Sequence, residues 1–369
     1  MDTPHWYLLP NADEIDSPAL VVYKDRVLKN IRACVAKVAL PSLLRPHVKT
    51  NKMAEVCLLM LAEGITKFKC ATIAEAEMLG SVGAPDVLLA YQPVGPKIAR
   101  LLELQRQFPR TVFSCLVDSF TAAQQISNAA HVVSFRLPVY IDLNVGMNRT
   151  GIIPSEALQF AQSVSSLPGI RIVGVHAYDG HIADDDVATR TKRSEDAFKE
   201  VPSLVRELNG LCNTPMIIVA GGSPTFSYYA KRGDVECSPG TFVFWDMSYS
   251  TMMPEEPFEH AVLVLTRIVS IVDNERLCLD LGHKSLSADH SQPRVHFLNA
   301  QEAVPLSHSE EHLVVKVPDT SKYAVGELFY GVPKHICPTV ALYERAIVAE
   351  GNNAVGEWEV TARDKKLRW

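Results

Sequence analysis

Short apolar runs rich in β-branched residues alternate with longer amphipathic stretches between residues 43 and 244. A short continuous or alternating apolar run is typical of a buried strand, and a 3.6-residue period is typical of a helix packed on a sheet. Strand and helix repeated eight times over about 200 residues favour a closed (β/α)8 TIM barrel, because an open doubly wound sheet rarely needs so many units. The predicted strands are 43–50, 67–72, 86–91, 112–119, 138–145, 171–178, 216–223 and 236–244.

The pattern changes after Trp245. Segments 258–282, 312–317 and 345–362 are alternating and β-branched, and turn residues separate them with no convincing helix between them. This pattern predicts a separate β-domain. We therefore expect an α/β fold with a barrel domain at residues 19–246 and a C-terminal β-domain at 247–369, which residues 1–18 join.

Composition narrows the range of ligands. The 369 residues are 47% apolar and 21% charged, as in an ordinary folded protein. A formal charge of −6 argues against nucleic acid or an anionic membrane as partner, and favours small molecules. The chain shows no signal-peptide pattern or long apolar run, and its eight cysteines lack C-x-x-C spacing, so we expect a cytoplasmic protein with free thiols.

Two glycine-rich segments fall where a barrel enzyme often binds phosphate, in the loops around strands seven and eight. They are "AGGSPTF" at 220–226 and "CSPGT" at 237–241. Such clusters are often simple turns, but two of them in these two loops predict a phosphate site. Neither loop has the pattern of a nucleotide-triphosphate site, so a compact phosphorylated ligand is expected. The expected contacts are backbone N–H groups at Gly221, Gly222 and Gly240, and hydroxyls of Ser223, Thr225 and Thr241.

Lys49 ends the first predicted strand, on the same face of the barrel as these loops. A period of two places it on one side of the strand with Arg45 and His47, the side that we expect to face the barrel interior. A lysine at a strand end is often only a solvated terminus. Opposite a phosphate, however, its amine could form a Schiff base with a phosphorylated aldehyde, and pyridoxal phosphate is the obvious candidate.

Seven motifs together resemble the fold-type III pyridoxal-phosphate enzymes, in the D-threonine aldolase and D-serine dehydratase branch related to alanine racemase. The motifs span roughly residues 17–345 and read "RPHVKTNK", "IDLNVGMNRTGI", "GVHAYDGHI", "GGSPT", "SPGTFVFWD", "DLGHKSLSAD" and "PKHICPT". The resemblance implies a barrel with a C-terminal β-domain. It also implies a homodimer whose active sites lie where one barrel meets the β-domain of its partner.

The resemblance also implies roles for individual residues. Lys49 would be the Schiff-base lysine, and Arg149 would hydrogen-bond the phenolic oxygen of the cofactor. Tyr178 and His181 would line the substrate pocket, with His181 as a proton carrier. The remaining implied cofactor contacts are His47, Gly221, Gly222, Ser223, Thr225, Gly240 and Thr241.

A metal site is implied near the C-terminus. His335 and Cys337 are two residues apart, so in an extended segment they would face the same way and could share one ion. The pair is a weak motif by itself, but in the related enzymes it binds a divalent ion next to the cofactor. A thiolate ligand favours zinc, with manganese as the alternative.

The expected activity is that of a lyase acting on D-β-hydroxy amino acids. A D-threonine aldolase would release glycine and an aldehyde, whereas a D-serine or D-3-hydroxyaspartate dehydratase would give a keto acid and ammonia. The His-x-Cys pair resembles the dehydratases, since an aspartate often fills the second position in aldolases. A racemase would need no metal, and a non-catalytic pyridoxal-phosphate carrier would be a lone barrel, so both are less favoured.

Overall fold

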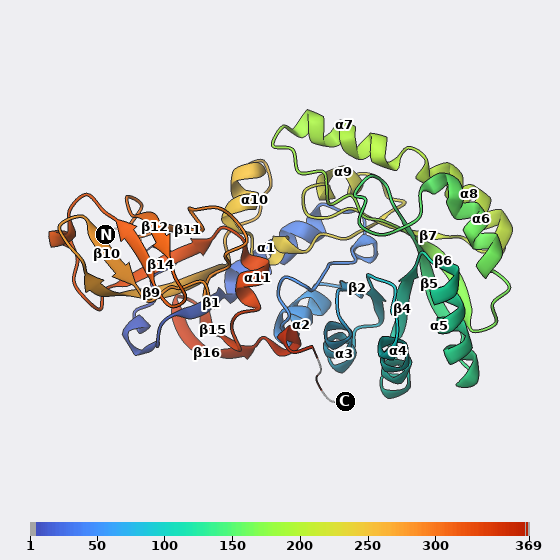
Figure 1. The fold of residues 1–369 in the computed structure, drawn as a ribbon, viewed down its shortest axis with the longest axis horizontal. Helices are drawn as coiled ribbons and strands as arrows, with labels where there is room; N and C mark the ends of the chain where they lie inside the picture. The colour runs from blue at the N-terminus through green and yellow to red at the C-terminus, as the bar shows by residue number, and fades with distance from the viewer. Residues whose placement is uncertain (1–4, 366, 368–369) are drawn as a thin grey trace. The chain divides into compact units, whose positions relative to one another are not determined.

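The computed structural model describes residues 5–365 and 367. The chain divides into two compact units (Figure 1). The barrel unit contains Cys34–Lys49, Cys57–Gly240 and the C-terminal residues from Asp364 onward. The β unit contains the residues before Cys34, Thr50–Val56 and Thr241–Arg363. Each unit has its own sheet and is described separately below.

The barrel unit is built on a parallel sheet with the strand order β2-β3-β4-β5-β6-β7-β8 (Figure 1). Helices alternate with the strands along the chain, as the hydrophobic pattern predicts. The strands are β2 Lys67–Cys70, β3 Asp86–Leu89, β4 Val112–Val117, β5 Leu137–Leu143, β6 Ile170–Ala177, β7 Ile217–Ala220 and β8 Glu236–Cys237. The helices are α2 Ala54–Ala62, α3 Ile73–Ser81, α4 Pro96–Gln107, α5 Phe120–Val132, α6 Pro154–Val164, α7 Val187–Phe198, α8 Val201–Cys212 and α9 Phe226–Tyr229.

Residues 44–48, which we call the closing segment, complete the ring between β8 and β2. Leu44 forms a parallel bridge with Cys237, and His47 forms one with Lys69. The Arg45 N–H donates to the Cys237 carbonyl at 2.8 Å, and the Val48 N–H donates to the Lys69 carbonyl at 2.9 Å. With this eighth member the predicted (β/α)8 barrel is confirmed.

Most of the predicted strands are shorter than the pattern indicates, and the two that differ most, 43–50 and 236–244, each contain a proline. Pro46 has no N–H to donate, so the closing segment pairs through isolated bridges and not through a continuous ladder. Strand β8 ends at Cys237, two residues before Pro239, and Thr241–Val243 forms a 3-10 helix. The predictions of continuous strands over 43–50 and 236–244 were therefore wrong in extent.

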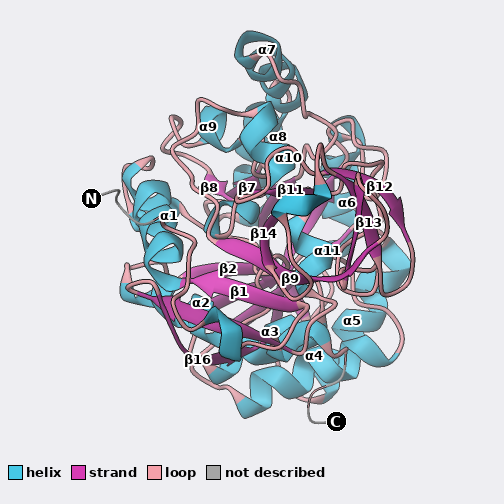
Figure 2. Cartoon of the chain, turned by 90° about the vertical axis from the view of Figure 1, so that its left-hand side faces the viewer, coloured by secondary structure: helices cyan, strands magenta, loops and turns pink. Residues whose placement is uncertain are grey.

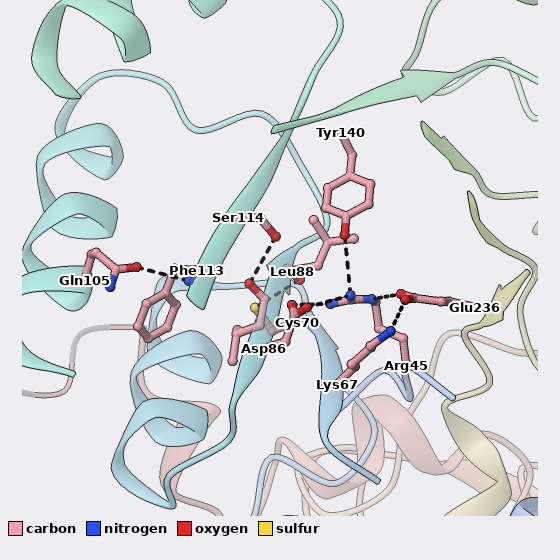
Figure 3. A network of polar contacts seen from close by, with 11 residues as sticks. Arg45, Lys67, Cys70, Asp86, Leu88, Gln105, Phe113, Ser114, Tyr140 and Glu236 are labelled. Atoms are coloured by element: carbon pink, nitrogen blue, oxygen red, sulfur yellow. Dashed lines mark hydrogen bonds and ion pairs between the residues drawn. The ribbon is translucent and has the colours of Figure 1, made fainter. Parts of the chain in front are cut away.

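Arg45 points into the barrel, where two carboxylates neutralise its charge (Figure 3). Its side chain is fully buried, and its guanidinium lies 2.6 Å from Asp86 Oδ1 and 2.7 Å from Glu236 Oε2. Tyr140 accepts a further hydrogen bond at 3.4 Å, and Lys67 pairs with the other oxygen of Glu236. The ion cluster connects the closing segment to β8 through Glu236 and to β3 through Asp86.

Replacing Arg45 by methionine is expected to destabilise the protein by about 3–5 kcal/mol, because it leaves buried carboxylates without their main counter-ion. The free energy of unfolding in urea, followed by circular dichroism, measures this cost. Lys67→Met is the matched control, because the partly exposed Lys67 is only a secondary partner of Glu236. Equal losses for the two variants would contradict a central role for Arg45.

The β unit consists of a mixed sheet in the order β12-β13-β10-β9-β1-β15-β16, with β14 also paired to β9 and to β11 (Figure 2, strands in magenta). The N-terminal strand β1 belongs here, antiparallel to β9 and parallel to β15. No helix in the described part of the chain is long and apolar enough to cross a membrane. The strands are β1 Ala19–Tyr23, β9 Val262–Ile271, β10 Arg276–Leu279, β11 Val295–Phe297, β12 Val304–His308, β13 Leu313–Lys316, β14 Leu328–Pro333, β15 Arg345–Glu350 and β16 Asn353–Glu359, and the helices are α1 Lys24–Ala36, α10 Met247–Met252 and α11 Ile336–Val340.

Candidate active site

A cavity of about 300 Å³ opens in the barrel unit, where several strands reach their carboxyl ends. Four residues that the sequence predicts for a cofactor site, from three separate parts of the chain, line this one cavity: His47, Lys49, Arg149 and Tyr178. The other lining residues are Lys69, Ala71, Ala90, Tyr91, Thr150 and His176. This is the end of a barrel at which enzymes of this architecture bind their substrates.

Lys49 lies directly after the closing segment, and its side chain is exposed to the cavity. Its backbone N–H donates to the Nδ1 atom of His47 at 3.3 Å, which fixes the local turn. The inward direction predicted for this side of the segment is thus found for Arg45, His47 and Lys49. Arg45, however, forms ion pairs with Asp86 and Glu236 and does not line the cavity.

Arg149 is held by a loop that Asn144 organises. The side-chain oxygen of Asn144 accepts from the N–H groups of Gly146 at 3.1 Å and Asn148 at 3.0 Å. Gly146 has φ +118°, and a Cβ there would come within 2.8 Å of His181 Nε2, so a side chain does not fit. The loop places the Arg149 guanidinium 5.2 Å from the centroid of the Tyr178 ring.

His181 does not line the cavity. It packs beside Gly146 at the Arg149 loop, and its Nδ1 atom has no hydrogen-bond partner among the described residues. Burial and then the charge of Arg193 lower the pKa of His181. A neutral imidazole at this loop can accept a proton, but the structure separates it from the four predicted residues that share the cavity.

The two glycine-rich loops converge within the barrel unit. The Gly240 N–H donates to Ser223 Oγ at 3.2 Å, so the two loops are directly bonded. Gly221 adopts φ +77°, and a Cβ there would lie 2.6 Å from the ring of Tyr229, so the backbone follows a path that only glycine fits. The Ser238 hydroxyl is buried and has no partner among the described residues. An unpaired buried donor in the second glycine-rich loop fits an anionic ligand.

Thr225, predicted as a phosphate contact, hydrogen-bonds to two groups of the protein. Its hydroxyl donates to Asp179 Oδ1 at 2.9 Å and accepts from the Gly222 N–H at 3.1 Å, and its side chain is buried. The Thr225 side chain therefore stabilises the conformation of the first glycine-rich loop through its hydrogen bond with Gly222. Burial raises the pKa of Asp179 to about 6, although Thr225 and Tyr229 both donate to this carboxylate. Thr241 is the next residue after Gly240 and is grouped with the β unit.

Sequence reasoning missed a polar chain in the wall of the cavity, formed by Lys69, His176 and Asp142. Lys69 Nζ lies 3.4 Å from His176 Nε2, and His176 Nδ1 lies 2.7 Å from Asp142 Oδ1. All three residues are nearly inaccessible to solvent. The available signal was a titratable residue inside each of three mainly buried strands, which is costly unless the charges are paired.

In the β unit, His335 and Cys337 lie at the start of helix α11. The extended segment expected here was wrong: His335 is the N-cap residue, with extended backbone angles, and Cys337 lies in the first turn. The helix begins here because buried Asp246 accepts from the Ile336 N–H at 3.1 Å and so caps the end of the helix. Thr50 Oγ1 lies 3.2 Å from Cys337 Sγ.

Two further residues that the sequence analysis did not select lie beside His335. Asp289 Oδ2 lies 2.5 Å from His335 Nδ1, and the ligand atoms of Asp289, His290 and His335 all lie within 4.8 Å of one another. A carboxylate on one ring nitrogen fixes the tautomer that presents the other nitrogen to a metal. Asp289 falls within the "DLGHKSLSAD" motif, so the motif was noticed but this residue within it was not.

The His335 imidazole and the Cys337 thiol shift the pKa of each other in opposite directions. Burial lowers the pKa of His335, but Cys337 and Asp289 outweigh it and raise the value to about 9. Burial raises the pKa of the Cys337 thiol, but His335 outweighs this effect and the net shift is downward. A thiol with thiolate character beside an oriented imidazole is a donor set that fits a divalent metal, and zinc in particular.

A family model described as "Alanine racemase, N-terminal domain" matches residues 22–245, which is more than half of the chain. The chain belongs to this family. A second family model, a serine dehydratase domain, matches residues 261–349, the part that contains His335 and Cys337. Pyridoxal phosphate is the cofactor expected for the alanine racemase-like family, and the cavity with the amine of Lys49 fits it. The glycine-rich loops do not line this cavity, but Gly222 lies beside Tyr178, which does.

Three relatives that match almost the whole chain are lyases by name. A D-threonine aldolase from an Arthrobacter species is 29% identical over 362 residues, which cover 95% of this chain and 93% of the relative. A D-threo-3-hydroxyaspartate dehydratase from Delftia sp. (strain HT23) is 24% identical over 374 residues, with 94% and 97% covered. The crystal structure of D-threonine aldolase from Filomicrobium marinum superposes with a TM-score of 0.88 at 26% identity and covers 98% of this chain and 99% of that one. The resemblance read from the motifs is confirmed, and a divalent metal is consistent with these relatives.

Proposed function

We propose that this protein is a pyridoxal-phosphate- and divalent-metal-dependent lyase that cleaves D-β-hydroxy amino acids, D-threonine among them, to glycine and an aldehyde. The observation that carries the proposal is the presence of two sites in one chain. The first is a cavity lined by Lys49 and Arg149, and the second is an imidazole–thiol pair, His335 and Cys337, oriented by Asp289. A racemase of this family would have no use for the second site.

Lys49 would hold the cofactor covalently, and the loops at Gly221–Ser223 and Ser238–Gly240 would bind its phosphate. Arg149 would provide a cation near the cofactor ring. When bound, pyridoxal phosphate withdraws electrons from the bonds at the α-carbon of an amino acid. Tyr178 lines the same cavity and would limit the space next to the substrate. His181 is proposed as a proton acceptor from its position beside Gly146 in the Arg149 loop, outside the set of residues that line the cavity.

His335 and Cys337 would bind the metal, with Asp289 fixing the imidazole through Nδ1. A bound divalent ion supplies Lewis-acid polarisation of a hydroxyl group. A β-hydroxyl is present in every substrate class considered, which is why we propose that both sites act on the same molecule. The thiol favours zinc over manganese, because soft sulfur ligands select zinc.

Dehydration is the second candidate function. The second metal ligand is a cysteine, the residue implied for the dehydratase members, and the serine dehydratase domain model covers the segment that carries it. The Delftia relative is a dehydratase by name. The same residues would serve both reactions, so the difference lies in whether the α–β carbon bond or the bond to the β-hydroxyl is broken.

Product analysis tests the proposed function. The purified holoenzyme is incubated with D-threonine, D-serine and D-threo-3-hydroxyaspartate, with the L-enantiomers as matched controls. We expect glycine and acetaldehyde from D-threonine and no product from L-threonine. Appearance of 2-oxobutanoate from D-threonine, or pyruvate from D-serine, would assign the protein as a dehydratase, and interconversion of enantiomers alone would reject a lyase.

A further inference from the structure

The polar chain in the cavity wall contains an amine that the proposed cofactor binding does not use. Lys69 lines the same cavity as Lys49, yet only 2% of its surface is exposed. Its Nζ atom lies 3.4 Å from His176 Nε2 and 5.2 Å from the centroid of the Tyr178 ring. A lysine in an apolar strand usually extends its amine to water, so this buried position needs a partner.

His176 links Lys69 to a buried carboxylate. Its Nδ1 atom lies 2.7 Å from Asp142 Oδ1, and Thr150 Oγ1 donates to the other carboxylate oxygen at 2.8 Å. Because the Asp142 carboxylate can only accept, Nδ1 carries the proton and Nε2 presents its lone pair to Lys69. The series of polar contacts therefore runs from the Lys69 amine at the cavity, through the His176 imidazole, to the Asp142 carboxylate.

The surroundings favour loss of a proton from Lys69. Burial and then the charge of Lys49 lower the pKa of Lys69 to about 7, although Asp179 and Asp142 act in the opposite direction. Burial also lowers the pKa of His176. Charged and titratable groups face Lys69 from the closing segment, β3, β5 and β6 with their loops: Arg45, His47, Lys49, Tyr91, Asp142, Arg149, His176, Tyr178 and Asp179.

We propose that Lys69 is a second acid–base group of the cavity, which exchanges a proton with His176 while Asp142 holds the imidazole. The inference rests on the proposed lyase function of the same cavity. The Lys69 amine takes a proton from the cavity side and passes one from Nζ to His176 Nε2. The imidazolium that forms is paired with the Asp142 carboxylate, and the proton returns by the reverse path. The proton that enters from the cavity comes from the amino-acid substrate of the proposed reaction and is returned to it, and only the transfer between Lys69 and His176 runs between two nitrogen atoms.

The protonation of Lys69 is measured by NMR on the full-length protein labelled with ¹³C at the lysine Cε atoms, with and without cofactor. We expect one signal, absent from Lys69→Met, to titrate near pH 7. Asp142→Asn should move this titration to lower pH and Lys49→Met to higher pH, each by roughly one pH unit, because they remove charges of opposite sign. Lys97→Met removes an exposed lysine and should leave the titration in place.

Lyase kinetics test whether the proton exchange at Lys69 contributes to turnover. The neutral amine accepts the proton, so kcat/KM should rise with pH through the Lys69 titration. Lys69→Arg keeps the positive charge but never releases its proton, and should lose this limb of the profile and about 10²-fold or more in kcat/KM. A wild-type profile for Lys69→Arg, or a Lys69 signal titrating near the ordinary ~10.4, would overturn the inference. If the wild-type protein yields no lyase products, the proposed function fails, whereas the NMR titration still decides the state of Lys69.

Discussion

Replacing Lys49 by alanine is expected to abolish lyase turnover, with a loss on the order of 10³-fold or more in kcat, because Lys49 is the residue proposed to hold the cofactor covalently. The visible absorbance that the cofactor gains when bound to a lysine should vanish from the purified variant. Steady-state kinetics with D-threonine and an absorbance spectrum of the same sample measure both effects.

Lys49→Arg separates covalent attachment from charge. Arginine keeps a cation in the cavity but cannot attach the cofactor, so it should be as inactive as the alanine variant. Lys97→Ala is the matched control, because Lys97 is an exposed lysine of the same barrel unit that does not line the cavity. Retained lysine-type absorbance in Lys49→Ala would show that another amine attaches the cofactor, and Lys69 would then be the first residue to examine.

Removing the metal is expected to stop turnover while leaving the lysine-bound absorbance of the cofactor intact, since the proposed metal ligands and Lys49 are different residues. His335→Ala should reproduce this result, because it deletes a ligand. Asp289→Asn should weaken metal affinity by roughly 10–100-fold, because the amide no longer fixes the imidazole as a carboxylate does. Metal content by mass spectrometry and competition with a chelator quantify the affinities.

His283→Ala provides the control for the metal experiment, because this histidine lies in the same segment of the β unit but outside the group around His335. It should keep wild-type metal content. Full activity of His335→Ala, or of thoroughly chelated protein, would refute a catalytic metal. Loss of the cofactor absorbance together with the metal would instead show that the ion has a structural role.

The sequence predicted those parts of the fold and the site that depend on local pattern. The periodicity of the strands determined the barrel, and the fixed geometry of a barrel then brought Lys49, Arg149 and Tyr178 to one cavity. The glycine-rich loops were found because strict backbone conformations require glycine at positions such as Gly221. The barrel, Lys49 and the glycine-rich loops needed only the residues and their places on an element, whereas Arg149 and Tyr178 were implied by the family resemblance.

The features that sequence reasoning missed depend on partners far away in the chain. Burial and the charge of Lys49 lower the pKa of Lys69. Its contact with His176 spans 107 positions of the chain. Asp289 contacts His335 across 46 positions. The inward direction of Arg45 was predictable, but its neutralisation by Glu236 was not, because no local pattern indicates which buried charges will pair.

The closing segment also has a consequence for solubility. Without residues 44–48, β2 and β8 would be the two open edges of a seven-stranded parallel sheet, and unpaired strand edges are templates for intermolecular pairing. The segment covers both edges with few backbone bonds, so the buried ions of Arg45, Asp86 and Glu236 supply much of what keeps it in place. These ion pairs therefore help to protect the barrel from aggregation. Their loss by mutation or protonation would expose the edges of β2 and β8 together.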